Sequence, residues 1–426
     1  MNSRKILSKS ATVLVTMERM NKKLGLIFSV LFLDFFSFSA VIAFLPLFFL
    51  ETPHSFFAAT DSLKLRYLLL GVLSSTYPIA QVIAAPLLGH LSDKIGRRGV
   101  LLCSYLGNTL GYLFCSLGIL TTSIIPLFIG NFIAGLTGVN LSTTNAIISD
   151  EATETRRSRF FAISHLMLGI GFILGPYVAG KVVTLSSHLF TACFYLFLAC
   201  AFFSFVNFLL IYFFWKKEED NLISTKLTEV RWRDLLNCTK PLKILLLAEF
   251  LVFLGWYFFI KTFQVFLVEE AKCNEGQVFN LYSQYGLWFA LSQVVFILWL
   301  HKFSKKLLRK SIVLFAGSIF FLAFFKNYST ACLIVPFFTF AYAILAPSLT
   351  GLVAEFSVDD HGKVMGLHQS IQAFAKILGP LMAGCLLTFT PLATVVFSPI
   401  FILASLLVFG FHAKVRNVVD NTSAHS

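Results

Sequence analysis

The sequence predicts an all-α integral membrane protein in which twelve transmembrane helices form two six-helix halves of the same orientation. Of its 426 residues, 57% are hydrophobic and 13% are charged, and the mean hydropathy is +0.80. Soluble globular chains carry about 25% charged residues, so a soluble fold is excluded. Apolar runs of about 20 residues, the length of a membrane-spanning helix, follow one another along nearly the whole chain. A segment of the first half also recurs in the second.

Charged and turn residues divide the apolar sequence into twelve candidate spans. The only long polar stretch inside the chain, residues 215–241, separates the sixth span from the seventh. We therefore predict a tail over 1–23, an N-terminal half over 24–214, a C-terminal half over 242–413 and a second tail over 414–426. The first span is too long for a signal peptide, and we expect it to remain in the mature protein. In chain order the spans begin near Leu24, Tyr67, Val100, Ser123, Phe160, Leu189, Leu242, Val278, Ser311, Thr330, Val364 and Leu392.

The positions of the basic residues predict the orientation in the membrane. Most of the 34 lysines and arginines lie in the two tails, the middle loop and the connections on the same side of the predicted bundle. The positive-inside rule assigns that side to the cytoplasm, so both termini are expected there. The net charge of +13 is then explained by topology, and we expect no nucleic-acid partner. The expected location is a cell membrane, most consistent with a bacterial inner membrane.

A repeated segment supports the division into two halves. Residues 174–180 read Leu-Gly-Pro-Tyr-Val-Ala-Gly, and residues 378–384 read Leu-Gly-Pro-Leu-Met-Ala-Gly. Glu151 and Glu355 are separated by the same offset, without a gap in the alignment. Two halves of six spans with one orientation are a parallel repeat about an axis normal to the membrane, as in transporters.

The connection after the second span carries a specific motif. Residues 89–98 read Gly-His-Leu-Ser-Asp-Lys-Ile-Gly-Arg-Arg. An ordinary positive-inside loop would explain the arginines, but not two glycines and an acid at this spacing. The segment resembles the G-x-L-(S/A)-D-x-x-G-R-(R/K) signature of the major facilitator superfamily, and the resemblance extends over nearly the whole chain. It implies alternating access between two rocking halves and a cytoplasmic latch formed by Gly89, Asp93, Gly96, Arg97 and Arg98.

Two further segments resemble the drug/proton antiporter branch of this superfamily, which includes the tetracycline exporters. The fifth span carries an antiporter-like glycine and proline pattern, although packing of small residues could also explain it. Its residues are Gly171, Gly175, Pro176 and Gly180. In the first span Leu33-Asp34 is followed by Ser37, Ser39 and Pro46. A carboxylate inside an apolar span is costly, so Asp34 is the leading candidate for proton coupling. The alternative is an acid near the interface.

One position departs from the drug-exporter pattern. The resemblance implies an arginine in the fourth span, about four residues before the glycine of residue 135, where this chain has Asn131. That arginine is commonly linked to proton transfer in the family. Its replacement puts the usual coupling route in doubt, and Asn131 remains a candidate polar residue of the transport pathway.

Other polar residues occur at membrane depth in the second half. Glu249 and Lys261 lie in the seventh span, and Gln369, Gln372 and Lys376 share one face of the eleventh at spacings of three and four. A lysine near mid-membrane must pair, bind an anion or lose its proton. We favour an ion pair of Lys376 with Asp34 over a bound anion, and Lys261 could also reach the outer interface. His165 and His368 are interpreted as helix-surface residues.

Together these features predict a transporter without cofactor or metal. There is no phosphate-binding loop, nucleophile elbow or metalloprotease motif, and the eight cysteines are scattered singly. The first hypothesis is proton-coupled efflux of small amphipathic compounds by a monomer, with protons as the coupling ion. A second is transport of an anionic metabolite or siderophore-like compound through Lys376 and Lys261. A third is a membrane sensor or assembly partner that transports nothing.

Overall fold

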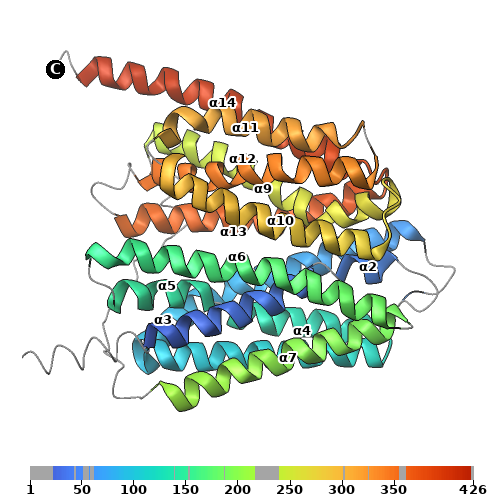
Figure 1. Ribbon diagram of the computed structural model, residues 1–426. Coiled ribbons are helices and arrows are strands. Elements are labelled where there is room, and N and C mark those ends of the chain that lie inside the picture. The colour runs from blue at the N-terminus through green and yellow to red at the C-terminus, as the bar shows by residue number, and fades with distance from the viewer. Residues whose placement is uncertain are drawn as a thin grey trace, which may run out of the picture.

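The computed structural model describes residues 23–42, 45–50, 57, 62–138, 140–151, 154–186, 188–215, 239–300, 303–324, 326–354 and 361–423. Within these ranges the chain is helical and has no strand, and the helices run along one common direction (Figure 1). The first helix covers residues 23–42. The others are α2 (Leu45–Leu50), α3 (Leu63–Leu120), α4 (Ile124–Thr137), α5 (Asn140–Glu151), α6 (Glu154–Leu185), α7 (Leu189–Phe214), α9 (Lys240–Glu269), α10 (Glu275–Val295), η2 (Phe296–Leu300), α11 (Ser304–Phe321), α12 (Tyr328–Ala354), α13 (His361–Leu387) and α14 (Ala393–Ser423).

Ten helical stretches in the described part are long and apolar enough to cross a membrane. They match ten of the twelve predicted spans. The predicted fourth span is instead two shorter helices, α4 and α5, and the ninth corresponds to α11. The predicted second and third spans belong to α3, which bends at Gly96 with a φ of 74°. Residues with side chains rarely adopt this backbone conformation, which explains the glycine of the signature.

Local sequence explains where several helices begin. The Ser62 side chain accepts a hydrogen bond from the backbone N–H of Leu65 at the start of α3. A capping box between Asn274 and Gln277 starts α10, so the connection from α9 is short. Pro241 lies in the first turn of α9, where its missing N–H breaks no helical hydrogen bond.

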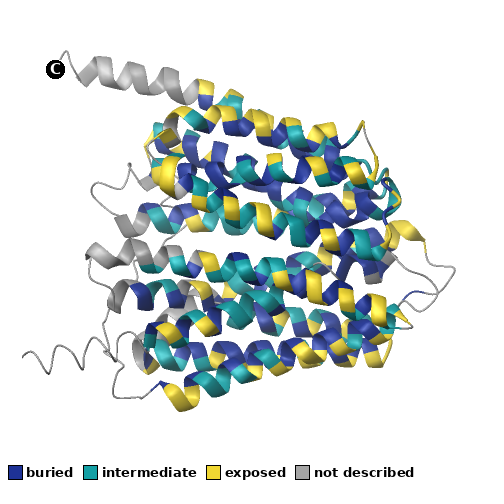
Figure 2. Ribbon diagram, viewed as in Figure 1, coloured by how far each residue is buried: buried dark blue, intermediate teal, exposed yellow. Residues whose placement is uncertain are grey.

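The outer surface of the bundle is apolar, as expected for a protein surrounded by lipid. Phe202, Phe214, Phe324 and Leu407 are each more than half exposed. Exposed residues lie along the outer faces and at the helix ends, while buried residues fill the interior (Figure 2). Contiguous exposed apolar surface of this kind is unusual for a soluble monomer and is typical of a membrane protein.

The N-terminal half extends from the first helix to α7 and the C-terminal half from α9 to α14, and they meet mainly through α6 against α10 and α3 against α13. We use the name basic end for the end of the bundle that carries Lys23, Arg98 and Lys240. Lys23 there lies 4.4 Å above the ring of Trp215. The predicted middle loop falls outside the described residues, except at its two ends.

The halves contact each other closely toward the end opposite the basic end. A Cβ atom on Gly71 of α3 would lie 3.0 Å from Cα of Gly384 on α13. Close by, the Ser75 hydroxyl donates a hydrogen bond of 2.8 Å to the Ile377 carbonyl. Gln264 of α9 reaches the carbonyl of Ile42, at the end of the first helix, at 3.3 Å. The two halves are thus joined by a close backbone approach at Gly71 and by side-chain hydrogen bonds to backbone carbonyls.

Candidate functional site

The first membrane-depth acid, Asp34, is held by an asparagine from a different helix. The Asn140 amide donates to both carboxylate oxygens, at 3.0 and 3.2 Å. Asn140 is 5% exposed, and its Oδ1 atom has no hydrogen-bond partner among the described residues. An amide offers both donors and an acceptor, so after rotation it can also accept a hydrogen bond from a protonated Asp34. The arrangement therefore accommodates both protonation states of the acid.

A break in the predicted fourth span brings Asn140 to Asp34. The chain leaves α4 at Gly138 and re-enters a helix at Asn140. The Gly138 carbonyl, which has left the helical ladder, accepts a hydrogen bond from the Gln81 amide of α3. The Tyr77 hydroxyl lies where a side chain on Gly138 would project, and its ring centroid is 6.3 Å from that of Phe38. Asp34, Asn140, Tyr77, Gln81 and Gly138 thus form one polar site of the N-terminal half.

The antiporter-like segment of α6 positions the helix that carries Asp34. A Cβ atom on Gly171 would lie 2.9 Å from Cβ of Phe35, and Gly175 packs against Ser39. The Ser39 hydroxyl donates to the Gly171 carbonyl at 2.9 Å. Further along α6, past Pro176, Gly180 packs against Phe279 of α10 in the other half. One helix therefore links the acid-bearing helix to the interface between the halves.

Asn131 does not take part in this site. Its amide donates to the Leu127 carbonyl of its own helix at 3.0 Å and points toward the Cys115 sulfur at 3.8 Å. Asn140, which follows the break at Gly138, contacts Asp34 instead.

The signature after the second span is described only in part. The side chains of residues 85–94 lie outside the description, so the predicted role of Asp93 and the environment of Gly89 stay untested. Arg98 donates to the Tyr212 carbonyl at 2.9 Å and lies 5.7 Å from the centroid of the Tyr212 ring. This contact fastens the bend of α3 at Gly96 and Arg97 to the end of α7, within the same half.

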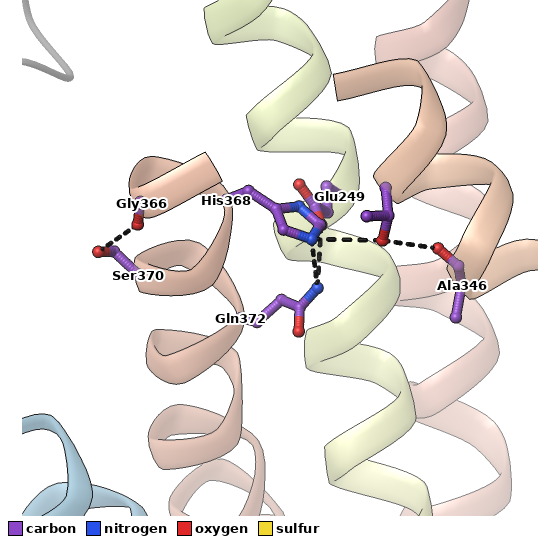
Figure 3. Close-up of polar contacts among 7 residues, drawn as sticks. Glu249, Ala346, Gly366, His368, Ser370 and Gln372 are labelled. Carbon is purple, nitrogen blue, oxygen red and sulfur yellow. Dashed lines mark hydrogen bonds and ion pairs between the residues drawn. The ribbon is translucent and has the colours of Figure 1, made fainter. Parts of the chain in front are cut away.

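The second half contains its own buried polar cluster, centred on Glu249 of α9 (Figure 3). Glu249 Oε1 lies 2.6 Å from Nδ1 of His368 on α13, and the two side chains are 0% and 5% exposed. The Gln372 amide lies 3.4 Å from Glu249 Oε1 and 3.0 Å from His368 Nε2. The Thr350 hydroxyl of α12 is 3.3 Å from the same imidazole nitrogen.

This cluster corrects one expectation. The interpretation of His368 as a helix-surface residue is wrong, because its side chain is buried against Glu249. The buried face of α13 carries His368 and Gln372, one turn apart, whereas Gln369 is exposed. His368 could have been found from the sequence as the residue one turn before Gln372 on the same helical face.

Two lysines of the second half gather around one tyrosine. The Lys376 amine lies 5.8 Å from the centroid of the Tyr257 ring, and Lys261 follows Tyr257 by one turn on α9. Both lysines are half-buried. Within the described part of the chain, neither forms an ion pair with a carboxylate. The predicted pair of Lys376 with Asp34 is therefore wrong for this conformation, since Asp34 contacts Asn140 in its own half.

Long apolar helices in two halves, with acids and lysines held at membrane depth near the interface, define a secondary membrane transporter rather than an enzyme. The family model of the Major Facilitator Superfamily matches residues 27–243 and 245–424. The chain belongs to that superfamily.

Relatives of the chain include drug-resistance proteins. It is 35% identical to tetracycline resistance protein class H of Pasteurella multocida over 170 residues, which is 40% of this chain and 40% of that relative. It is 27% identical to the class D protein of Salmonella ordonez over 327 residues, covering 73% of this chain and 78% of the relative. Identity to quinolone resistance protein NorA of Staphylococcus aureus is 21%, over 86% of this chain and 90% of NorA.

Solved structures share the fold at low sequence identity. The human organic anion transporter MFSD10 is 19% identical, with a TM-score of 0.65 over 91% of this chain and 99% of that one. A D-xylose–proton symporter is 14% identical, with a TM-score of 0.71 over 91% and 96%. At these identities the similarity shows the fold alone.

Proposed function

We propose that the protein is a proton-coupled exporter of small amphipathic organic compounds that works as a monomer in a bacterial inner membrane, with both termini in the cytoplasm. The observation that carries this proposal is the contact between the half-buried Asp34 of the first helix and the buried Asn140 of α5. The drug-resistance names of the relatives, which extend over most of the chain in two cases, support the substrate class.

The site is suited to carry a proton through an alternating-access cycle. A charged residue at mid-membrane costs about 2.5–3.5 kcal/mol on insertion scales, and protonation of Asp34 removes that charge. Asn140 holds the acid in either state, so proton binding and release require little rearrangement of the site. The halves contact each other away from the basic end, which favours a pathway open toward the basic end in this conformation. In this conformation Asp34 would release its proton toward the basic end, and the substrate would bind from the same side.

An export assay tests this proposal. Cells that express the protein should accumulate less of a transported compound than cells with an empty vector, and a protonophore should remove the difference. The compounds should form a matched panel of cationic, neutral and anionic amphiphiles. Equal accumulation of every compound in both strains would overturn the proposal and favour the sensor hypothesis.

A second candidate, transport of organic anions, is favoured by the two lysines around Tyr257. Lys261 and Lys376 contribute two cationic groups at membrane depth with no carboxylate partner in the described part of the chain. Desolvated cations of this kind are normally paired, so an acidic group of a substrate is a suitable counter-charge. The same site could bind the acid group of a zwitterionic compound, which would make the two candidates compatible.

Lys376→Gln should weaken transport of anionic compounds and spare cationic ones. A hydrogen bond to a charged group is worth about 1.5–3 kcal/mol, so we expect the KM for an anion to rise about tenfold to a hundredfold. Lys181→Gln is the matched control, because Lys181 also lies 5.8 Å from a tyrosine ring, that of Tyr177, but is exposed. An unchanged KM for every anion in Lys376→Gln would remove the lysines from substrate binding.

A further inference from the structure

Two buried atoms of the Glu249–His368 pair lack a well-aligned hydrogen bond among the described residues, Oε2 of Glu249 and Nδ1 of His368. Glu249 Oε1 lies 2.6 Å from the imidazole, but Oε2 has no hydrogen-bond partner among the described residues and is shielded from solvent. An ion pair kept only for stability would be expected to satisfy the remaining carboxylate oxygen as well, because an unpaired buried polar atom is destabilising. The free oxygen therefore needs an explanation beyond packing.

Glu249 and Asp34 are both acids of the opening helix of their half, although their partners come from different spans, His368 from the fifth span of the second half and Asn140 from the fourth span of the first. Asp34 and Glu249 each lie in the opening helix of their half, roughly three turns after its basic end at Lys23 or Lys240. In each half the acid contacts a polar side chain of another helix in that half: Asn140 in the first, His368 in the second. Each half thus carries an acid at membrane depth in its opening helix, half-buried at Asp34 and buried at Glu249.

We propose that Glu249 and His368 form a second proton-binding site, so that the transporter moves one proton through each half. This inference rests on the proposed proton-coupled function. With one proton, on Nδ1 and facing Oε1 at 2.6 Å, the pair is a carboxylate beside a neutral imidazole with a net charge of −1. A second proton binds Oε2 of Glu249, which gives a carboxylic acid beside a neutral imidazole and no net charge. Its release at the basic end restores the starting pair, and no other bond changes.

The surroundings of His368 suit both of its protonation states. A neutral imidazole with its proton on Nδ1 can accept a hydrogen bond at Nε2 from the Gln372 amide, 3.0 Å away. An imidazolium can instead donate from Nε2 to the Thr350 hydroxyl oxygen at 3.3 Å, because that hydroxyl gives its own hydrogen to the Ala346 carbonyl. His368 Nε2 thus has a hydrogen-bond partner in either state, Gln372 when the nitrogen accepts and Thr350 when it donates.

Few other charges act on the pair. On the helices packed around it, the nearest titratable side chains in the described ranges are Lys243 and Tyr257 of α9, Tyr342 of α12 and Lys376 of α13. The part of α14 with described side chains, residues 393–410, contributes none. None of these groups is hydrogen-bonded to Glu249 or His368 in the structure.

The number of protons exchanged per substrate tests the inference. In proteoliposomes, the membrane voltage at which a fixed substrate gradient and a fixed proton gradient balance gives this ratio directly. Glu249→Gln should transport with one proton fewer per substrate than the wild type. Thr339→Val, which removes a buried hydroxyl of α12 that donates to carbonyls of its own helix, should keep the wild-type ratio. If Glu249→Gln is poorly folded, Glu249→Gln/His368→Gln removes both titratable groups together and should show the same reduced ratio. A wild-type ratio in either Glu249 variant would overturn the inference.

A second measurement separates failure of this inference from failure of the proposed function. Infrared difference spectra of the substrate-free protein between alkaline and acidic pH should contain two bands of protonated carboxyl groups at membrane depth. Glu249→Gln should lose one band and Asp34→Asn the other. If wild-type vesicles move no protons with any substrate but both bands are present, the export function is wrong and the second proton site stands. If Glu249→Gln leaves the spectrum unchanged, Glu249 takes up no proton and the inference fails.

Discussion

Replacing Asp34 with asparagine should abolish uphill export while substrate binding and downhill exchange persist. Asparagine has nearly the same shape as aspartic acid but cannot bind and release a proton. Its amide can still hydrogen-bond to Asn140, which lies 3.0 Å from the native carboxylate, so the packing of the helix against α6 should be kept. The measurement is accumulation of a labelled compound in vesicles with an imposed proton gradient, compared with exchange of the same compound without any gradient.

Two variants serve as controls for this result. Asp34→Glu keeps a titratable group and should retain part of the uphill transport. Asn131→Leu changes a polar residue of similar depth that contacts only its own helix and Cys115 in the structure, and it should leave coupling intact. Uphill export by Asp34→Asn at the wild-type rate would move proton coupling away from the first helix altogether.

Gly71→Leu should drive the two halves apart at the end opposite the basic end. A Cβ atom at residue 71 would lie 2.6 Å from the Pro380 carbonyl oxygen and 3.0 Å from Cα of Gly384. These are backbone atoms of the other half, so they cannot turn aside as a side chain could. Overpacking of this kind costs about 1–3 kcal/mol, enough to shift a two-state equilibrium roughly 5- to 150-fold.

Spin labels at residues 63 and 389 would report this shift. Leu63 and Phe389 are both exposed and lie near the closed end, one in each half. In a cysteine-free background, Gly71→Leu should lengthen the distance between the labels and slow transport. Gly317→Leu is the matched control, because a Cβ atom at Gly317 would meet no atom within 4 Å. An unchanged distance distribution in Gly71→Leu would mean that this glycine contact does not hold the closed end together.

Much of the fold follows from the sequence because lipid imposes a simple rule on composition. Apolar runs of bilayer length and clustered basic residues predicted ten spans that the structure contains as long apolar helices. The fourth span differs because the helix ends at Gly138 and a second helix, α5, begins at Asn140 with the polar residues Asn-Leu-Ser-Thr-Thr-Asn. Such a break depends on partners such as Gln81 from another helix, which hydropathy does not reveal.

The site was predictable only in its charged members. Asp34 and Glu249 are recognisable because an acid inside an apolar run is rare. Their partners Asn140 and His368 are polar residues of common types, and which of them meets an acid depends on the rotation and neighbours of each helix. The predicted pairing of Lys376 with Asp34 is wrong for the same reason. Opposite charge alone does not determine which helices are adjacent, and α13 packs on α9 and α3.

The most direct test of the central claim is proton movement driven by substrate in liposomes that contain only this protein. With a pH-sensitive dye inside and no other ion gradient, addition of a transported drug should move protons in the opposite direction to the drug, in a fixed ratio. Asp34→Asn should show drug exchange without proton movement. Drug transport by the wild type with no accompanying proton movement would contradict the account, because the buried acids would then carry no proton across the membrane.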